Sequence, residues 1–488
     1  MKKKVLSPLL VFTVIAVYFS ILVLVSLLTS RKATSETFFR GNRSSPWFLV
    51  AFGMIGASIS GVTFISVPGD VGNIAFGYFQ LVLGYIPGYM FIYLVLLPMY
   101  YKYDLISIYS FLGRRFGKVS YKTGSIFFLA SQTMGASLRL FLAALVLQIA
   151  FFNAFGIPFI ITVACTIALI WLYTFKGGIK TIVWTDTLQT MFMLTAMVLT
   201  IFSISKAMGY DFSGMVNAIV DSPQSKIFNW DWSSKQNFFK QFFSGAFIAI
   251  VMTGLDQNMM QKNLTCKTLR HAQKNMFWMS LSLIPVNLLF LSLGVLLYSY
   301  AASHGIAIPE RSDELFPLIA LKHFDWYVSL LFLLGITSAA FSSADSALTA
   351  LTTSFCYDFL GFENKSEEIR KKQRVKVHLA FSLLMLIVIV VFKELNDSSV
   401  IQAVFTVAGY TYGPLLGLFF YGLFTKWRVY DKAVPFFAVA SPLLTYLISF
   451  LAKKYGDYSF SYELLMLNGI IMFGLLGLSS VLKAEPVK

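Results

Sequence analysis

Long apolar segments alternate with short polar segments along almost the whole chain of 488 residues. The apolar segments have roughly 20 or more residues, the length that an α-helix needs to cross the hydrocarbon core of a bilayer. The pattern therefore predicts an all-α polytopic membrane protein with about 13 transmembrane helices. The expected spans cover residues 5–29, 46–74, 76–100, 121–152, 157–175, 182–207, 238–261, 274–303, 325–357, 375–393, 397–425, 433–452 and 461–482.

The composition supports this class of protein, because 57% of the residues are hydrophobic, 13% are charged and the mean hydropathy is +0.71. By itself the net charge of +16 would fit nucleic-acid binding, but most Lys and Arg residues lie in the short loops. Basic loops are usually cytoplasmic, so the charge places the N-terminus outside and the C-terminus in the cytoplasm. Three basic clusters support this orientation, and Lys2, Lys3 and Lys4 oppose it; the clusters are Arg31, Lys32, Arg40 and Arg43, then Arg114, Arg115 and Lys118, then Arg370, Lys371, Lys372 and Arg374.

One apolar segment carries many hydroxyl groups and a carboxylate, in the stretch 335–349. At 100° per residue, Ala339, Ser342, Ser343 and Ser346 share one face of the expected helix, with Asp345 beside them. A carboxylate inside a membrane normally faces a partner, a cavity or an ion path. Hydroxyl and carboxylate oxygens are suitable ligands for an alkali cation, so this face indicates a cation site. Close packing of small residues between helices is the alternative.

The second apolar segment contains several glycines and hydroxyls in its middle, over residues 53–63. Such a composition weakens a helix and favours a break, whose free carbonyls can bind ions or a substrate. The alternative is a close helix contact through Gly53 and Ala57. The sequence alone leaves both interpretations open.

Three charged residues in or next to apolar segments also need an explanation. Arg139 lies about midway along the fourth segment, where it either offers its guanidinium to a substrate carboxylate or pairs with a buried carboxylate. Asp186 lies near the start of the sixth segment and is either a buried ligand or a helix N-cap. Asp256 follows Gly254 in the seventh segment, which indicates a second break or an interfacial turn.

With these features in place, the chain resembles the sodium:solute symporter family, which includes sodium/glucose, sodium/proline and bacterial sodium/sialic-acid transporters. The resemblance runs almost from end to end. The matching stretches lie at residues 38–43, 56–64, 176–189, 256–267, 272–273, 339–343 and 409–417.

The resemblance implies a leucine-transporter-type fold, in which two five-helix halves form a 5+5 inverted repeat with extra flanking helices. On this basis the first transmembrane helix and its loop occupy 1–45. The two halves occupy 46–207 and 208–425, with an external loop at 208–237, and two C-terminal helices occupy 426–488.

The resemblance also implies Na⁺ as the coupling ion. The main sodium site would use the backbone carbonyls of Gly56, Ile59 and Ala339 and the hydroxyls of Ser342 and Ser343. A second sodium site would use Asp186, Asp345 and Ser346, although the family members with this site have Ser where this chain has Asp345. The substrate residues carried over in the same way are Ser58, Ser60, Thr63, Gln80, Arg139 and Asp256.

We therefore expect a sodium-coupled symporter of the bacterial cytoplasmic membrane that imports a small organic solute by alternating access. Arg139 favours an organic acid, an acidic sugar or a zwitterion, while a neutral sugar and proton coupling are alternatives. The expected partners are the solute, sodium ions and the lipid bilayer, without nucleic acid. A membrane-embedded transferase is a different class, which would need a catalytic His or acid pair near a membrane face, and the sequence contains no such constellation. A channel is a third class, and no selectivity ring is evident in the sequence.

Overall fold

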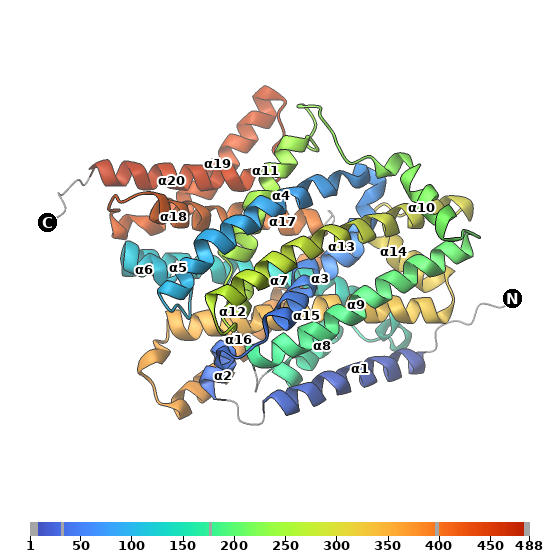
Figure 1. The fold of residues 1–488 in the computed structure, drawn as a ribbon, viewed down its shortest axis with the longest axis horizontal. Coiled ribbons are helices and arrows are strands. Elements are labelled where there is room, and N and C mark those ends of the chain that lie inside the picture. The colour runs from blue at the N-terminus through green and yellow to red at the C-terminus, as the bar shows by residue number, and fades with distance from the viewer. Residues whose placement is uncertain (1–7, 31–33, 175–177, 396–399, 483–488) are drawn as a thin grey trace.

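The computed structural model describes residues 8–30, 34–174, 178–395 and 400–482. This part of the chain is an assembly of helices and contains no β-strand. Figure 1 shows long helices that lie side by side across the molecule. Lys2, Lys3, Lys4, Arg31 and Lys32, which entered the prediction of orientation, lie outside the described residues.

Each of the thirteen predicted spans corresponds to a helix or to a short series of helices. By length and composition, eight helical stretches among the described residues could cross a membrane, or ten if two bent helix pairs are counted as spans. One stretch, Trp47–Lys102, covers two predicted spans, and two further apolar helices are shorter. The helices are α1 (Pro8–Thr29), α3 (Trp47–Ile74), α4 (Tyr78–Phe91), α5 (Leu97–Lys102), α7 (Lys118–Ala150), α8 (Phe159–Thr174), α9 (Ile179–Ala207), α11 (Phe238–Ala249), α12 (Gln257–Asn263), α13 (Leu269–Ser303), α15 (Trp326–Asp358), α16 (Glu367–Leu395), α17 (Val400–Thr411), α18 (Gly413–Phe424), α19 (Val434–Gly456) and α20 (Leu464–Leu482).

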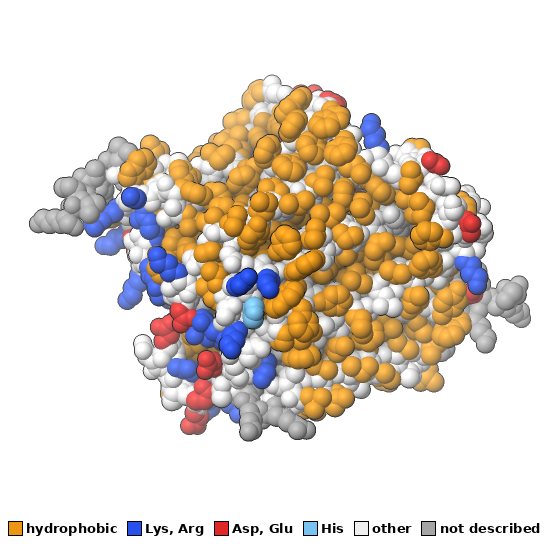
Figure 2. All heavy atoms as spheres, in the orientation of Figure 1, with side chains coloured by type: hydrophobic (Ala, Val, Ile, Leu, Met, Phe, Trp, Pro, Cys, Tyr) orange, Lys and Arg blue, Asp and Glu red, His pale blue; other side chains and the backbone are white. Residues whose placement is uncertain are grey.

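The centre of the molecule is formed by α3, α7, α9 and α15, and α15 packs against each of the other three helices. In α15 the residues are buried along almost the whole length, whereas α1, α16 and α19 bury only a minor part of their surface. Small residues in α15 allow neighbouring helices to approach closely, while the outer helices turn apolar side chains outward. In Figure 2 the visible surface is mostly hydrophobic, and Lys and Arg gather toward one end of the molecule.

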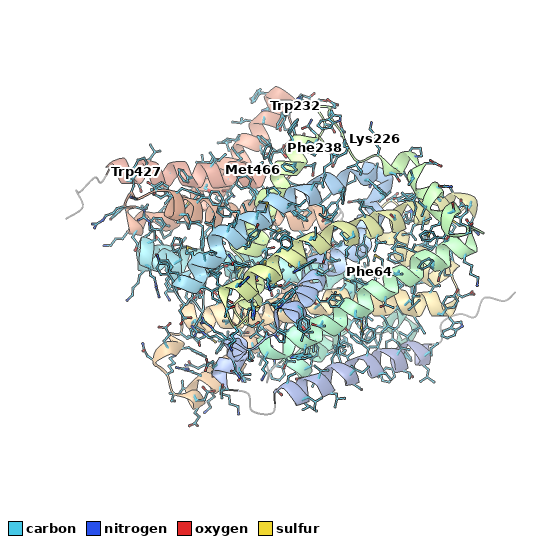
Figure 3. The ribbon with its side chains drawn as sticks, viewed as in Figure 1. Phe64, Lys226, Trp232, Phe238, Trp427 and Met466 are labelled. Carbon is cyan, nitrogen blue, oxygen red and sulfur yellow. The ribbon has the colours of Figure 1, made fainter. Side chains whose placement is uncertain are left out.

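Aromatic side chains fill the space between these central helices. Phe64 of α3 is fully buried and packs edge-on or tilted against the rings of Phe290, Phe316 and Phe332. Figure 3 shows Phe64 in the interior, whereas Trp232 lies at the periphery near the start of α11. Trp232 is 66% exposed, as is typical of aromatic residues at a membrane interface.

Three helical spans are interrupted. α3 changes direction at Ser60, whose φ of 51° and ψ of 171° are not helical. α11 and α12 meet at a bend of 68° after a π-helical turn over Ile250–Gly254, and α17 and α18 meet at a bend of 46°. Interrupted helices leave backbone groups without intrahelical partners, so these three places can bind ligands or act as hinges.

Candidate functional site

The break in α3 lies directly against α15. A Cβ atom added at Gly61 would lie 3.2 Å from the side chains of both Ala340 and Ile336, so α3 and α15 are in close contact beside Ser60. Because Ser60 interrupts the helical ladder, the carbonyl groups of the preceding turn, including those of Gly56 and Ile59, are candidates for external ligands. The break and the packing of small residues were alternative interpretations of this segment, and the structure contains both features.

The packing of α3 on α9 involves the same segment. A Cβ atom at Gly53 would lie 2.9 Å from the Cβ atom of Asp186, and one at Gly56 would overlap the hydroxyl oxygen of Thr190. Only glycine therefore fits at Gly56 without a shift of one helix or a displacement of the Thr190 side chain. The hydroxyl of Thr190 is buried and has no hydrogen-bond partner among the described residues.

Two serines of α15 complete the predicted main sodium site. The Ser343 hydroxyl is buried and lacks a hydrogen-bond partner in the described part of the chain. The Ser342 hydroxyl donates its proton to Oδ1 of Asp186 at 2.7 Å, which leaves the oxygen lone pairs of Ser342 free. Ala339 lies one residue from the contact with Gly61. Together these groups offer hydroxyl and carbonyl oxygens, the ligands that suit a hard cation.

A buried ion pair lies next to these serines. The Lys262 ammonium of α12 is 2.6 Å from Oδ2 of Asp186, and both side chains are almost completely inaccessible to solvent. Asp186 lies inside α9 rather than at its N-terminus, so the helix N-cap interpretation is wrong. Lys262 was not predicted as a site residue, because the expected span ended at residue 261.

Asp345 lies on the other side of Ser346 from this ion pair. Its Oδ2 accepts a hydrogen bond from the Tyr173 hydroxyl at 2.9 Å. The Ser346 hydroxyl is 3.0 Å from Oδ1 of Asp345 and 3.4 Å from Oδ2 of Asp186, so the two carboxylates flank one hydroxyl. The structure thus brings Asp186, Asp345 and Ser346 together, while the binding of a second sodium ion there stays a prediction.

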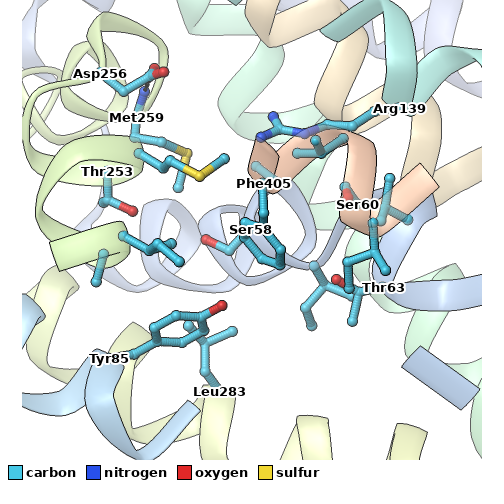
Figure 4. Close-up of a pocket in the computed structure, with 18 of the residues that line it drawn as sticks. Ser58, Ser60, Thr63, Tyr85, Arg139, Thr253, Asp256, Met259, Leu283 and Phe405 are labelled. Carbon is cyan, nitrogen blue, oxygen red and sulfur yellow. Dashed lines mark hydrogen bonds between the residues drawn. The ribbon is translucent and has the colours of Figure 1, made fainter. Parts of the chain in front are cut away.

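A cavity of about 90 Å³ lies between the broken helices, and it has room for a few water molecules or a small solute. Five of the six predicted substrate residues line it, namely Ser58, Ser60, Thr63, Arg139 and Asp256. In Figure 4 the Arg139 side chain extends toward this cavity from one side and Tyr85 lies at another. Several further lining residues were not predicted from the sequence, including Tyr78, Tyr85, Tyr89, Thr253, Asn258, Asn287 and Phe405.

The two charged residues of the cavity are not equivalent. Oδ1 of Asp256 caps α12 by accepting the Asn258 backbone N–H at 2.8 Å, and Oδ2 accepts the Tyr412 hydroxyl. Arg139 forms no ion pair with a described carboxylate, although it attracts Asp256 electrostatically. The Asp256 oxygens are therefore engaged by the protein, while the half-buried Arg139 guanidinium is available to a solute.

Gln80 is not among the residues that line the cavity, and its role as a substrate residue stays a prediction. Its amide nitrogen donates to the Gln236 carbonyl at 2.9 Å, and its amide oxygen accepts the Asn229 backbone N–H at 3.1 Å. Gln80 is fully buried beneath the 208–237 loop and holds that loop in place. Its hydrogen-bonding capacity is therefore used within the protein.

Comparison with known proteins gives a match over most of the chain. The model of the sodium:solute symporter family matches residues 38–432. Sodium-coupled monocarboxylate transporter 2 of Mus musculus is 25% identical over 82% of this chain, and the match spans 65% of that transporter. The sodium/sialic acid symporter SiaT of Proteus mirabilis is 22% identical, with 98% of this chain and 94% of the symporter covered.

Solved structures show the same fold. A substrate-bound, outward-open Na⁺-coupled sialic acid symporter aligns with a TM-score of 0.83 and 19% identity, covering 98% of both chains. A nucleobase-cation-symport-1 family transporter aligns with a TM-score of 0.57 and 15% identity, covering 90% of this chain and 92% of its own. The predicted fold class, an all-α transporter fold of the leucine-transporter type, is confirmed.

Proposed function

Because the chain belongs to the sodium:solute symporter family, we propose that it is a sodium-coupled symporter that imports a small organic anion. The observation that carries the proposal is the break of α3 at Ser60, pressed against α15 next to the unpartnered hydroxyl of Ser343. A cation bound there joins α3 and α15, so its presence favours one arrangement of the two helices. This is how ion binding can be coupled to a conformational change.

The proposed main sodium site uses the carbonyls of Gly56, Ile59 and Ala339 and the hydroxyls of Ser342 and Ser343. These groups carry no formal charge, and they replace the water ligands of the ion one by one. Asp186, Asp345 and Ser346 form a second cation site in this proposal. The named relatives are transporters, and nothing in the described chain favours the transferase alternative.

The solute class follows from the charges that line the cavity. Arg139 is available for a carboxylate or another anionic group, whereas the oxygens of Asp256 already accept hydrogen bonds from α12 and Tyr412. The hydroxyls of Ser58 and Thr63, together with the tyrosines, suit further polar groups of a solute. An organic acid or an acidic sugar therefore fits better than a neutral sugar, and the names of the monocarboxylate and sialic acid transporters agree with this class.

Transport by this mechanism requires a fixed orientation in a membrane. We place the chain in the bacterial cytoplasmic membrane with the N-terminus outside and the C-terminus in the cytoplasm. The halves 46–207 and 208–425 move relative to each other around the cavity, while 1–45 and 426–488 flank them. An inward sodium gradient drives import, because each positive charge releases about 2.3 kcal/mol per 100 mV of membrane potential.

Uptake by purified protein in liposomes tests the proposal. A panel with a monocarboxylate, a sialic acid and a neutral hexose is supplied outside, with inward gradients of sodium, choline or protons. We expect sodium-dependent uptake of an anion. Equal uptake in choline would refute sodium coupling, and uptake of the hexose alone would refute the solute class.

The Ser343→Ala variant tests the site itself. Losing one buried ligand costs about 1–3 kcal/mol, so the half-saturating sodium concentration should rise about 5- to 150-fold. Ser343 is the better probe than Ser342, because its hydroxyl has no partner that the substitution would also disturb. Ser20→Ala on the exposed face of α1 is the matched control and should leave the sodium dependence unchanged.

A further inference from the structure

Lys262 contacts Asp186 of the proposed second cation site, although no sequence feature assigned it a role. Its side chain is 1% exposed, and its ammonium is 2.6 Å from Oδ2 of Asp186. Beyond this ion pair, the ammonium has no hydrogen-bonding partner among the described residues. We propose that the Lys262 ammonium is the resident cation of the second site, so that one sodium ion rather than two accompanies each solute. This inference rests on the proposed function.

The ammonium contacts the central carboxylate of the second site. Oδ2 of Asp186 forms the ion pair with the Lys262 ammonium, and the Ser346 hydroxyl is 3.4 Å from the same oxygen. A sodium ion at Oδ2 would share this oxygen with the ammonium, and two cations a few ångströms apart in a buried site repel strongly. The ammonium therefore blocks the carboxylate that a second sodium ion would need most.

Asp345 does not require a sodium ion of its own. The Tyr173 hydroxyl donates to its Oδ2 at 2.9 Å, and the Ser346 hydroxyl is 3.0 Å from its Oδ1. Ser346 has a single proton, which it can also donate to the Ser342 carbonyl at 2.8 Å. Tyr173 therefore donates to Asp345 whichever acceptor the Ser346 proton takes, and this hydrogen bond needs no bound ion.

The same ion pair connects the two cation sites. By holding Asp186 in place, Lys262 fixes the acceptor of the Ser342 hydroxyl, whose proton then points away from the main sodium site. The oxygen lone pairs of Ser342 are thereby turned toward the sodium ion. Lys262 also belongs to α12, whose N-cap Asp256 lines the substrate cavity. It is therefore a positioning residue between the solute and the main sodium site.

Equilibrium binding of ²²Na⁺ to the purified full-length protein, together with sodium-dependent uptake, tests this inference. We expect one sodium ion bound per wild-type chain and a Hill coefficient for sodium of about one, since the Hill coefficient cannot exceed the number of sites. Lys262→Met removes the ammonium and leaves Asp186 of the second site free for a sodium ion, so the number of bound sodium ions should rise to two. Lys262→Arg keeps the positive charge and should stay at one. Lys267→Met, at an exposed lysine nearby, is the matched control and should also stay at one.

Two sodium ions bound to the wild-type chain would overturn the inference without any variant, while leaving the proposed function intact. A single ion bound to folded Lys262→Met, with the affinity of the wild type, would also overturn it. Sodium-independent uptake by the wild type would instead refute the proposed function. A loss of folding in Lys262→Met leaves the wild-type count as the deciding measurement.

Discussion

The contact between Gly56 and Thr190 provides a sharp test of the α3 geometry. In Gly56→Ala the new methyl group would overlap the Thr190 hydroxyl and lie 3.1 Å from the Thr190 Cβ atom. Either α3 moves away from α9 or Thr190 is displaced. Overpacking of this kind costs about 1–3 kcal/mol. Since Gly56 also supplies a proposed sodium ligand, the displacement should weaken sodium binding as well as the fold.

We expect the half-saturating sodium concentration for uptake to rise about 5- to 150-fold, the range that corresponds to about 1–3 kcal/mol. The thermal unfolding midpoint in detergent should fall at the same time. The double variant Gly56→Ala/Thr190→Ala removes the overlapping hydroxyl, which has no hydrogen-bond partner to lose among the described residues. It should therefore recover most of both losses, with a coupling free energy of about 1–2 kcal/mol.

Gly135→Ala in α7 is the control, because a Cβ atom at Gly135 has no neighbour within 4 Å. It should keep the sodium dependence and the unfolding midpoint of the wild type. A Gly56→Ala variant that behaves like Gly135→Ala would refute the close approach of α3 and α9. A double variant no better than the single variant would show that Thr190 is not the cause of the loss.

Three further variants test other contacts. Arg139→Lys keeps the charge but loses the planar fork, so the apparent affinity for an anionic solute should fall about 10-fold or more in uptake assays; full rescue by neutralising Asp256 would instead make Arg139 a structural counter-ion. Tyr412→Phe removes a donor to the buried Asp256, so the unfolding midpoint should fall by the equivalent of about 1–3 kcal/mol, and an unchanged midpoint would contradict the contact. Partial burial raises the pKa of Asp104, but the charges of Arg40 and Arg43 outweigh this effect and hold that pKa below its usual value. The Asp104 side chain is 58% exposed, so Asp104→Asn should cost at most about 1 kcal/mol at pH 7. Because the folded-state pKa is lowered, the difference in stability from the wild type should shrink as the pH falls below about 4, and a difference that grows in acid would refute the stabilising role of these ion pairs.

The helical spans could be predicted from the sequence because a bilayer imposes a minimum apolar length on every span. The break in α3 was also indicated, since glycines and hydroxyls at residues 53–63 are poor at sustaining a helix. The shared helix face of Ser342, Ser343 and Ser346, which we propose to bind cations, followed from helical periodicity within a single segment. These features depend on local sequence, so no knowledge of the tertiary structure was needed.

The partners of the charged residues could not be predicted in the same way. Lys262 lies just beyond the expected end of a span, where a lysine would ordinarily reach the aqueous interface. The bend of 68° between α11 and α12 turns this residue into the interior, and only the folded arrangement places it beside Asp186. Gln80 was predicted as a substrate residue, and its hydrogen-bond partners in the structure come from a loop whose position the local sequence does not indicate.

The bend between α17 and α18 depends on a residue from the last helix of the chain. The Asn468 side chain of α20 donates to the backbone carbonyls of Gly409 at 3.0 Å and Tyr410 at 2.9 Å, and the Ser441 hydroxyl of α19 contacts the Asn468 amide oxygen. These carbonyls belong to the last turn of α17, where the helix itself supplies no backbone N–H donors to the carbonyl oxygens. A shortened chain that stops after α18 would leave both carbonyls unpaired within the membrane, so the two C-terminal helices cannot be trimmed as mere flanks in protein engineering.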